Sequence, residues 1–204
     1  SWHTAGNMIF SPPTTDDVPI PEPDLPWMVA EELVKNLRRA PYRSRPIEVR
    51  RKMYSVDGTD QDWHYFTHGT LAYIVEGPHH NPKRSDVRKA DIIYLRPILN
   101  RGLTRLLLGP RLSGHVQSEG GEPLVATISI DEVVQNAGEV WNTRELDGRF
   151  DRMLAVNGVY TLRVRADGYE EWTQKVRVKG VRNVKVVLKP KVQPPPMEPA
   201  PANQ

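Results

Sequence analysis

The strongest constraint on how this chain can fold is a change in its hydrophobic pattern at Gly109-Pro110. Beyond that point, segments 126–130, 160–165, 173–178 and 184–188 alternate apolar and polar residues with period two, as half-buried strands do. Turn pairs such as Asn157-Gly158 and Asp167-Gly168 separate them. Short alternating strands with no helical window between them predict an all-β antiparallel sandwich over residues 110–190.

Residues 1–109 have a different hydrophobic pattern, which predicts an α/β unit. Apolar residues recur at helical spacing after Asp24 and Pro26, which indicates a helix over about 27–39. The run 71–76 has the length and composition of a strand covered on both faces. A second helical stretch follows Ser85, and we expect it to kink or break at Pro97. This is too little sheet for two helices and a long loop to cover.

Composition narrows the possibilities further. The sequence contains no cysteine, which excludes a disulfide scaffold and thiolate chemistry. No apolar run approaches the roughly 20 residues of a membrane-spanning helix, so we expect no membrane span. Residues 191–204 are rich in proline and poor in aromatic residues, and we expect them to form a disordered tail.

Residues that could perform chemistry lie near the N-terminus and between residues 54 and 76. Residues 54–65 are expected to form a polar loop that leads into strand 71–76. Glu76 ends that strand, where active-site groups of open α/β sheets collect. A solvated carboxylate that merely caps the strand fits the same pattern.

The order of these residues resembles the second half of the zinc carboxypeptidases of the carboxypeptidase A type. The matching residues are His3 in His-Thr-Ala-Gly, Tyr54, the pair Asp62-Trp63 and Glu76 at the strand end. The resemblance covers about residues 1–108. It implies a catalytic α/β/α domain that hydrolyses C-terminal residues from peptides with a zinc-activated water.

The resemblance also implies a role for each matching residue. His3 would be the third zinc ligand, and Tyr54 would close over the peptide substrate. Gln61 and Asp62 would belong to the wall of the specificity pocket. Glu76 would be the general base and acid, because a carboxylate within reach of the attacking water can take its proton and pass it to the leaving amine.

The chain departs from the family pattern in one respect. None of its six histidines has a glutamate three residues later, so the family's His-x-x-Glu zinc ligands are absent from this sequence. The arginine that grips the substrate's carboxylate cannot be assigned to Arg43, Arg45, Arg50 or Arg51. We therefore expect the missing N-terminal portion of the catalytic domain to lie upstream, and this chain to be inactive alone.

The predicted sandwich resembles the carboxypeptidase regulatory-like, transthyretin-like domain that often follows such a catalytic domain. The resemblance rests on 112–116, 147–150, 158–164 and Gly168-Tyr169. The predicted sandwich contains no group of residues typical of a catalytic site. We therefore expect it to support folding, pack against the neighbouring domain or present a ligand.

Other functions remain open. The main alternative is a non-catalytic peptidase homologue that binds peptides or cell-wall material. Basic runs at 35–52 and 83–111 are explained more simply as solvated helix faces, so we expect no nucleic acid as partner. The resemblance to the family and the proline-rich tail favour a secreted or periplasmic location.

Overall fold

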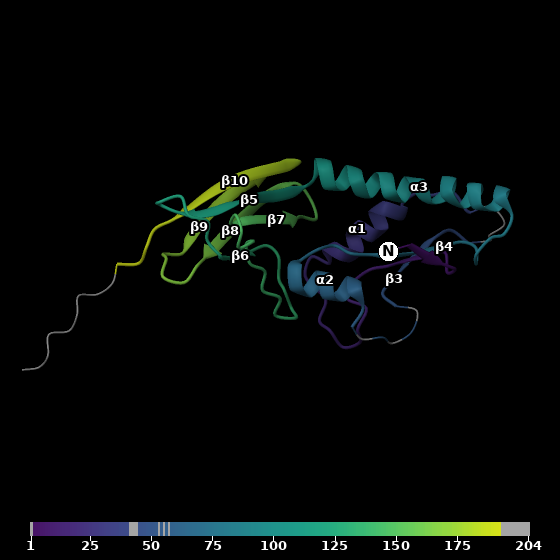
Figure 1. Ribbon diagram of the computed structural model, residues 1–204, viewed down its shortest axis with the longest axis horizontal. Helices are drawn as coiled ribbons and strands as arrows, with labels where there is room; N and C mark the ends of the chain where they lie inside the picture. The colour runs from purple at the N-terminus through teal and green to yellow at the C-terminus, as the bar shows by residue number, and fades with distance from the viewer. Residues whose placement is uncertain (1, 41–44, 53, 55, 57, 193–204) are drawn as a thin grey trace, which may run out of the picture.

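The computed structural model describes residues 2–40, 45–52, 54, 56 and 58–192, and the structural statements below refer to them. They form ten strands in three open sheets, together with three helices (Figure 1). The helices are α1 (Leu25–Val34), α2 (Asp60–His68) and α3 (Ser85–Leu108). The strands are β1 (Trp2–Thr4), β2 (Met8–Phe10), β3 (Glu48–Arg50), β4 (Ile74–Gly77), β5 (Arg111–Ser118), β6 (Thr127–Ile130), β7 (Arg149–Met153), β8 (Gly158–Arg165), β9 (Trp172–Val178) and β10 (Val181–Leu188).

The front of the chain builds a mixed sheet in the order β1-β4-β2-β3. Strand β4 is parallel to β1 and antiparallel to β2, and β2 is parallel to β3. Helices α1 and α3 pack against one face of this sheet, where Ile9, Val29, Leu33, Val75 and Ile98 are buried together. The sheet is larger than the single strand expected from the sequence, because β1, β2 and β3 are too short to show a periodic pattern.

Helix α1 begins where the sequence predicts. The Asp24 carboxylate accepts a hydrogen bond from the Trp27 backbone N–H at 3.2 Å, and Pro26 occupies the first turn. The helix ends earlier than expected, at Val34. Asn36 follows with a φ of +56°, which no residue of a right-handed helix adopts.

Of the kink or break expected at Pro97, the break is wrong, because α3 runs through that residue as one helix of 24 residues. Tyr94 and Ile98, on either side of Pro97, are both buried in the core beneath the helix. Packing on both sides of the proline thus favours a continuous helix over the local cost of the ring.

The expectation of a loop over residues 54–65 is wrong in its second half, where α2 begins. The Thr59 hydroxyl caps the helix by accepting from the Asp62 N–H at 3.4 Å, and Asp60 and Asp62 place negative charge in the first turn. Gly69 ends the helix in the left-handed conformation. Trp63 is exposed and contacts the rings of His64 and His68.

The second half of the chain forms two three-stranded sheets, β10-β5-β7 and β6-β8-β9, around a shared apolar core. Alternation along β8 buries Tyr160, Leu162 and Val164, as the period-two pattern predicts. The expectation of a purely antiparallel sandwich is wrong at one pair, since β10 lies parallel to β5. These two strands come from opposite ends of the segment, so no hairpin constrains their direction.

The two halves of the chain contact each other through Trp141. Its indole N–H donates to the Phe66 carbonyl at 3.2 Å, and its ring meets Tyr65 edge-on with centroids 5.7 Å apart. The Arg152 guanidinium lies over the same ring, 5.0 Å from its centroid. Gly69 completes the contact, because a Cβ atom there would lie 2.8 Å from the indole.

None of the described helices has both the length and the apolar composition needed to cross a membrane.

We predict that Gly69→Ala destabilises the protein beyond the cost of its backbone conformation. Gly58 supplies the matched control, since its φ of +71° is close to the +67° of Gly69 while a Cβ there would meet nothing within 4 Å. Both changes strain a left-handed residue by about 1–2 kcal/mol. Gly69→Ala should cost about 1–3 kcal/mol more because the methyl group would overlap Trp141.

Urea unfolding followed by tryptophan fluorescence and circular dichroism measures both free energies of unfolding. Equal losses for the two variants would show that the Gly69–Trp141 contact contributes nothing.

Candidate functional site

A cavity of about 410 Å³ lies on the face of the front sheet opposite α1 and α3. Alternation along β4 decides which side chains reach it: Val75 points to the helices, whereas Ile74 and Glu76 point to the cavity. The lining residues are His3, Ala5, Phe10, Thr14, Arg51, Lys52, Tyr54, Val56, Thr59, Gln61, Ile74 and Glu76. Four of the five candidate residues from the sequence, His3, Tyr54, Gln61 and Glu76, are therefore brought together.

His3 and Glu76 are neighbours across the sheet. They are register partners on the parallel strands β1 and β4, so both side chains emerge on the cavity face. His3 is exposed and Glu76 is half-buried. Gly6 makes room beside them: a Cβ atom at Gly6 would lie 3.2 Å from the Cβ of Glu76, and its backbone N–H donates to the Gly77 carbonyl at 3.1 Å.

Tyr54 and Gln61 also line the cavity and differ in exposure. The Tyr54 side chain is 68% exposed, which leaves its phenol accessible to a ligand. Gln61 is only 3% exposed, and its Oε1 atom accepts no hydrogen bond within the described structure. A buried amide oxygen without a donor is costly. This oxygen has almost no accessible surface, so it is not available to a molecule in the cavity.

Asp62 supports the cavity from behind and is not among the residues that line it. Its buried carboxylate accepts hydrogen bonds from the Thr14 N–H at 2.9 Å and from the Thr14 hydroxyl at 2.6 Å. It also accepts from the Thr15 N–H and hydroxyl at 3.2 and 3.1 Å. This carboxylate fastens the segment after β2 to the first turn of α2, and so positions Thr14 in the wall.

Two cations in the wall were not singled out by sequence reasoning. Arg51 pairs with Asp24 and stacks over Trp27, with its guanidinium carbon 4.9 Å from the ring centroid. Lys52 pairs with Asp16. Both charges are therefore already balanced by carboxylates of the same chain. The sequence offered no signal for these pairs, because each joins segments more than 25 positions apart.

The described residues do not by themselves make a zinc site. No group of three His, Cys, Asp or Glu side chains in that part of the chain lies close enough to hold a metal ion. His3 offers one nitrogen donor beside the Glu76 carboxylate, whereas a catalytic zinc takes three protein ligands. Further ligands would have to come from sequence outside these residues.

Comparison with known proteins assigns no family. No protein-family model matches the sequence, and no curated protein matches it. Among solved structures, two interface mutants of a type II cohesin–X-dockerin complex from Acetivibrio cellulolyticus are similar over 39% of this chain, at 16% identity and TM-scores of 0.33 and 0.31. The matched part spans 57% of the length of those chains. Similarity at this level supports no inference about fold or function.

We predict that Asp62→Asn lowers the free energy of unfolding by about 1–3 kcal/mol, because an amide cannot accept from all the donors that surround this carboxylate. Asp60→Asn makes the same change two residues away, at an exposed position of α2, and should cost less than about 0.5 kcal/mol. Chemical denaturation measures both, and equal effects would contradict the fastening role of Asp62.

Proposed function

We propose that this chain supplies the C-terminal half of the active site of a zinc carboxypeptidase, an enzyme that hydrolyses C-terminal residues from peptides. One observation supports the proposal. His3, Tyr54, Gln61 and Glu76, chosen from the order of motifs along the chain, line a single cavity. Nothing in their sequence spacing requires this, since they lie on two strands, a connecting segment and a helix.

The chain's own residues would divide the work as follows. Glu76 would accept the proton of the attacking water and return it to the leaving amine. The exposed phenol of Tyr54 would donate a hydrogen bond to the substrate. His3 would be one of the zinc ligands. Arg51 is a poor anchor for a substrate carboxylate because Asp24 already neutralises it, so that anchor is also expected outside the described residues.

The cavity wall indicates which peptide side chains would fit. Phe10 and Ile74 are apolar, and the amide of Gln61 in the wall is uncharged. Neutral side chains, with or without a hydrogen-bond donor, should therefore be accepted better than charged ones.

An apolar surface supports the proposal that an N-terminal portion of the domain packs here. Outward-facing leucines of α3 at positions 99, 103 and 106 lie with Trp2 along a second cavity of about 490 Å³. Trp2 is 50% exposed and Leu103 49%. Strand β1, which carries Trp2, is also an edge of its sheet. We propose that the upstream portion of the catalytic domain covers this surface and extends the sheet at β1.

The alternative is a non-catalytic homologue that binds peptides or cell-wall material in the same cavity. It is favoured by the lining, in which one histidine and one glutamate can hydrogen-bond a ligand but are too few to hold zinc. For either function we propose a secreted or periplasmic location and a transthyretin-like role for the sandwich.

We predict that the purified 204-residue chain, supplied with Zn²⁺, removes no C-terminal residue from a set of peptides with varied ends. Mass spectrometry of the peptides detects any shortening. Metal-dependent shortening by this chain would refute the proposal that the remaining ligands lie elsewhere.

A second prediction uses the chain extended at its N-terminus by the preceding sequence of its own gene. This longer protein should bind zinc and shorten peptides. Glu76→Gln should lower kcat by about 10²–10⁴-fold with the zinc content unchanged, because a positioned proton acceptor contributes that much. His3→Ala should lose zinc as well.

Glu48→Gln on the same sheet and His80→Ala at an exposed position are the matched controls and should leave both properties intact. If the longer protein binds the peptides without shortening them, the non-catalytic alternative is correct.

A further inference from the structure

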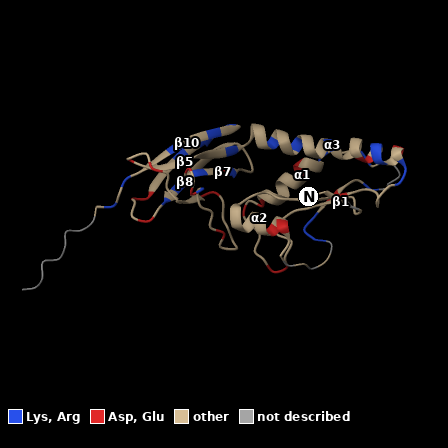
Figure 2. Cartoon of the chain, in the orientation of Figure 1, with Lys and Arg blue, Asp and Glu red and all other residues tan. Residues whose placement is uncertain are grey.

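Positive charge is concentrated in the last two strands of the sandwich. Residues 172–192 contain seven basic side chains and no acidic one, whereas the formal net charge of the entire chain is only +3. The remainder of the chain is therefore net acidic. Figure 2 shows several of these lysine and arginine residues in blue along β10.

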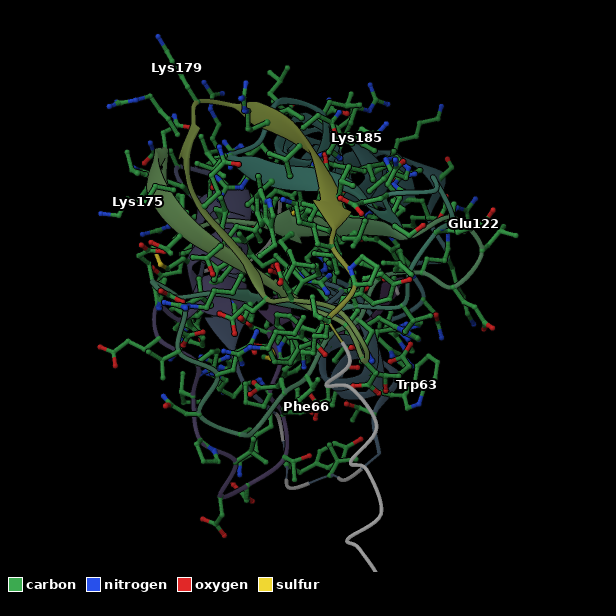
Figure 3. All side chains as sticks on the ribbon, turned by 90° about the vertical axis from the view of Figure 1, so that its left-hand side faces the viewer. Trp63, Phe66, Glu122, Lys175, Lys179 and Lys185 are labelled. Atoms are coloured by element: carbon green, nitrogen blue, oxygen red, sulfur yellow. The ribbon has the colours of Figure 1, made fainter. Side chains whose placement is uncertain are left out.

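Five of these cations surround a groove at one side of the sandwich. Strand β9 is the edge of one sheet and β10 the edge of the other, and a groove of about 560 Å³ lies along these two strands and the short turn that connects them. The cations that line it are Lys175, Arg177, Lys179, Arg182 and Lys185, all of them exposed. In Figure 3, Lys179 projects from the turn between β9 and β10, with Lys175 and Lys185 on either side.

These five cations have no ion-pair partner in the described part of the chain, unlike the arginines on the adjacent strand. Arg163 of β8 pairs with Asp131 at 2.6 Å and with Glu171 at 3.0 Å, and Arg165 pairs with Glu171 at 2.6 Å. The pairing lowers the pKa of the Glu171 carboxyl to about 2, chiefly through the hydrogen bond from Arg165. The sandwich therefore balances its positive charge at β8 and leaves it unbalanced at the β9–β10 groove.

The rest of the lining indicates what kind of anion would fit. The other lining residues are Gln174, Val176, Val181, Asn183 and Val184, so no aromatic ring is available for a nucleic-acid base to stack on. No large apolar side chain is present to enter a membrane. Alternate residues on a strand lie about 7 Å apart, which spreads the charges of Lys175, Arg177 and Lys179 in a row rather than gathering them around one small ion.

We infer that the β9–β10 groove binds a linear polyanionic polysaccharide, with the Gln174 amide available for its hydroxyl groups and cations for its sulfate, phosphate or carboxylate groups. The inference rests on charge complementarity and is independent of the proposed peptidase function. Lysines on edge strands also discourage sheet-to-sheet aggregation, and the test below separates the two roles.

The experiment measures the affinity of the full chain for dextran sulfate by isothermal titration calorimetry at several salt concentrations. Neutral dextran, a thymidine oligonucleotide and vesicles of anionic phospholipid serve as comparison ligands. The variant K175Q/R177Q/K185Q removes three of the groove's charges. K35Q/R38Q/R39Q removes three exposed charges at and after the end of α1 and gives the same net charge.

We expect dextran sulfate to bind with an affinity that falls as salt rises, and neutral dextran not to bind. Each cation near an anionic surface contributes about fivefold, so the groove variant should bind roughly 100-fold more weakly while the control variant binds nearly as the parent does. Chemical-shift changes confined to residues 174–185 on titration would locate the site even if a variant folded poorly.

Several outcomes would overturn the inference. Equal weakening in both triple variants would mean that net charge alone attracts the polymer. Tighter binding of the oligonucleotide or the vesicles would assign the groove to another class of partner. Absence of dextran sulfate binding, together with aggregation of the groove variant, would leave edge protection as the role of these cations.

Discussion

Strand β4 is only four residues long, and each of its side chains must point to one of two very different faces of the sheet. Val75 enters the apolar core under α1 and α3, while Glu76 enters the cavity on the other face. A slip of one residue would exchange these faces and place a carboxylate among valine, leucine and isoleucine side chains. Because burying an unpaired charge is far more costly than losing one strand hydrogen bond, the core fixes the register and the register fixes the site.

That constraint explains which parts of the site could be anticipated from the sequence. The apolar run before Glu76 indicated a strand over 71–76, of which only the part from Ile74 onward forms one, as Ile74–Gly77. Alternation along that strand decides on which face the Glu76 carboxylate emerges. The placement of His3 beside Glu76 came from the family resemblance, because a three-residue strand carries no periodic signal. The roles of Arg51 and Lys52 could not be anticipated, since their carboxylate partners are distant in sequence and meet them only in the folded chain. Asp62 was chosen as a pocket-wall residue, and it supports that wall through Thr14.

The fold was predictable where a signal was local and repeated. The start of α1 at Asp24 and Pro26 and the alternation along β8 are of this kind. Helix α2 also has local signals in the sequence, since Thr59 caps its N-terminus and Gly69 ends it. The expectation of a loop did not take these two residues into account. At Pro97 the local preference was overruled by packing, because residues before and after it are held in one core. The parallel pairing of β10 with β5 depends on the path of the whole sandwich, which no local pattern encodes.

The contacts between the two halves of the chain are polar as well as apolar. The buried guanidinium of Arg105, near the end of α3, donates to the carbonyls of Leu154 and Ala155 and pairs with Glu32 at 3.2 Å. Together with Trp141 it ties the sandwich to both α1 and α2. Burial also lowers the pKa of the Arg152 guanidinium beside Trp141 to about 10, so it remains a cation at neutral pH. These contacts leave little room for one half to rotate against the other.

The covalent connection between the two halves also restricts their relative rotation. Helix α3 ends at Leu108 and strand β5 begins at Arg111, so only Gly109 and Pro110 separate them. Two units joined by a long flexible linker can take many relative orientations, whereas a two-residue connection allows these two halves far fewer. Whatever holds the sandwich therefore also sets the direction in which the cavity on the front sheet opens. A ligand held on the same surface as the sandwich would reach the cavity only if the cavity opens toward that ligand. The relative orientation of the two halves would therefore decide which ligands have access.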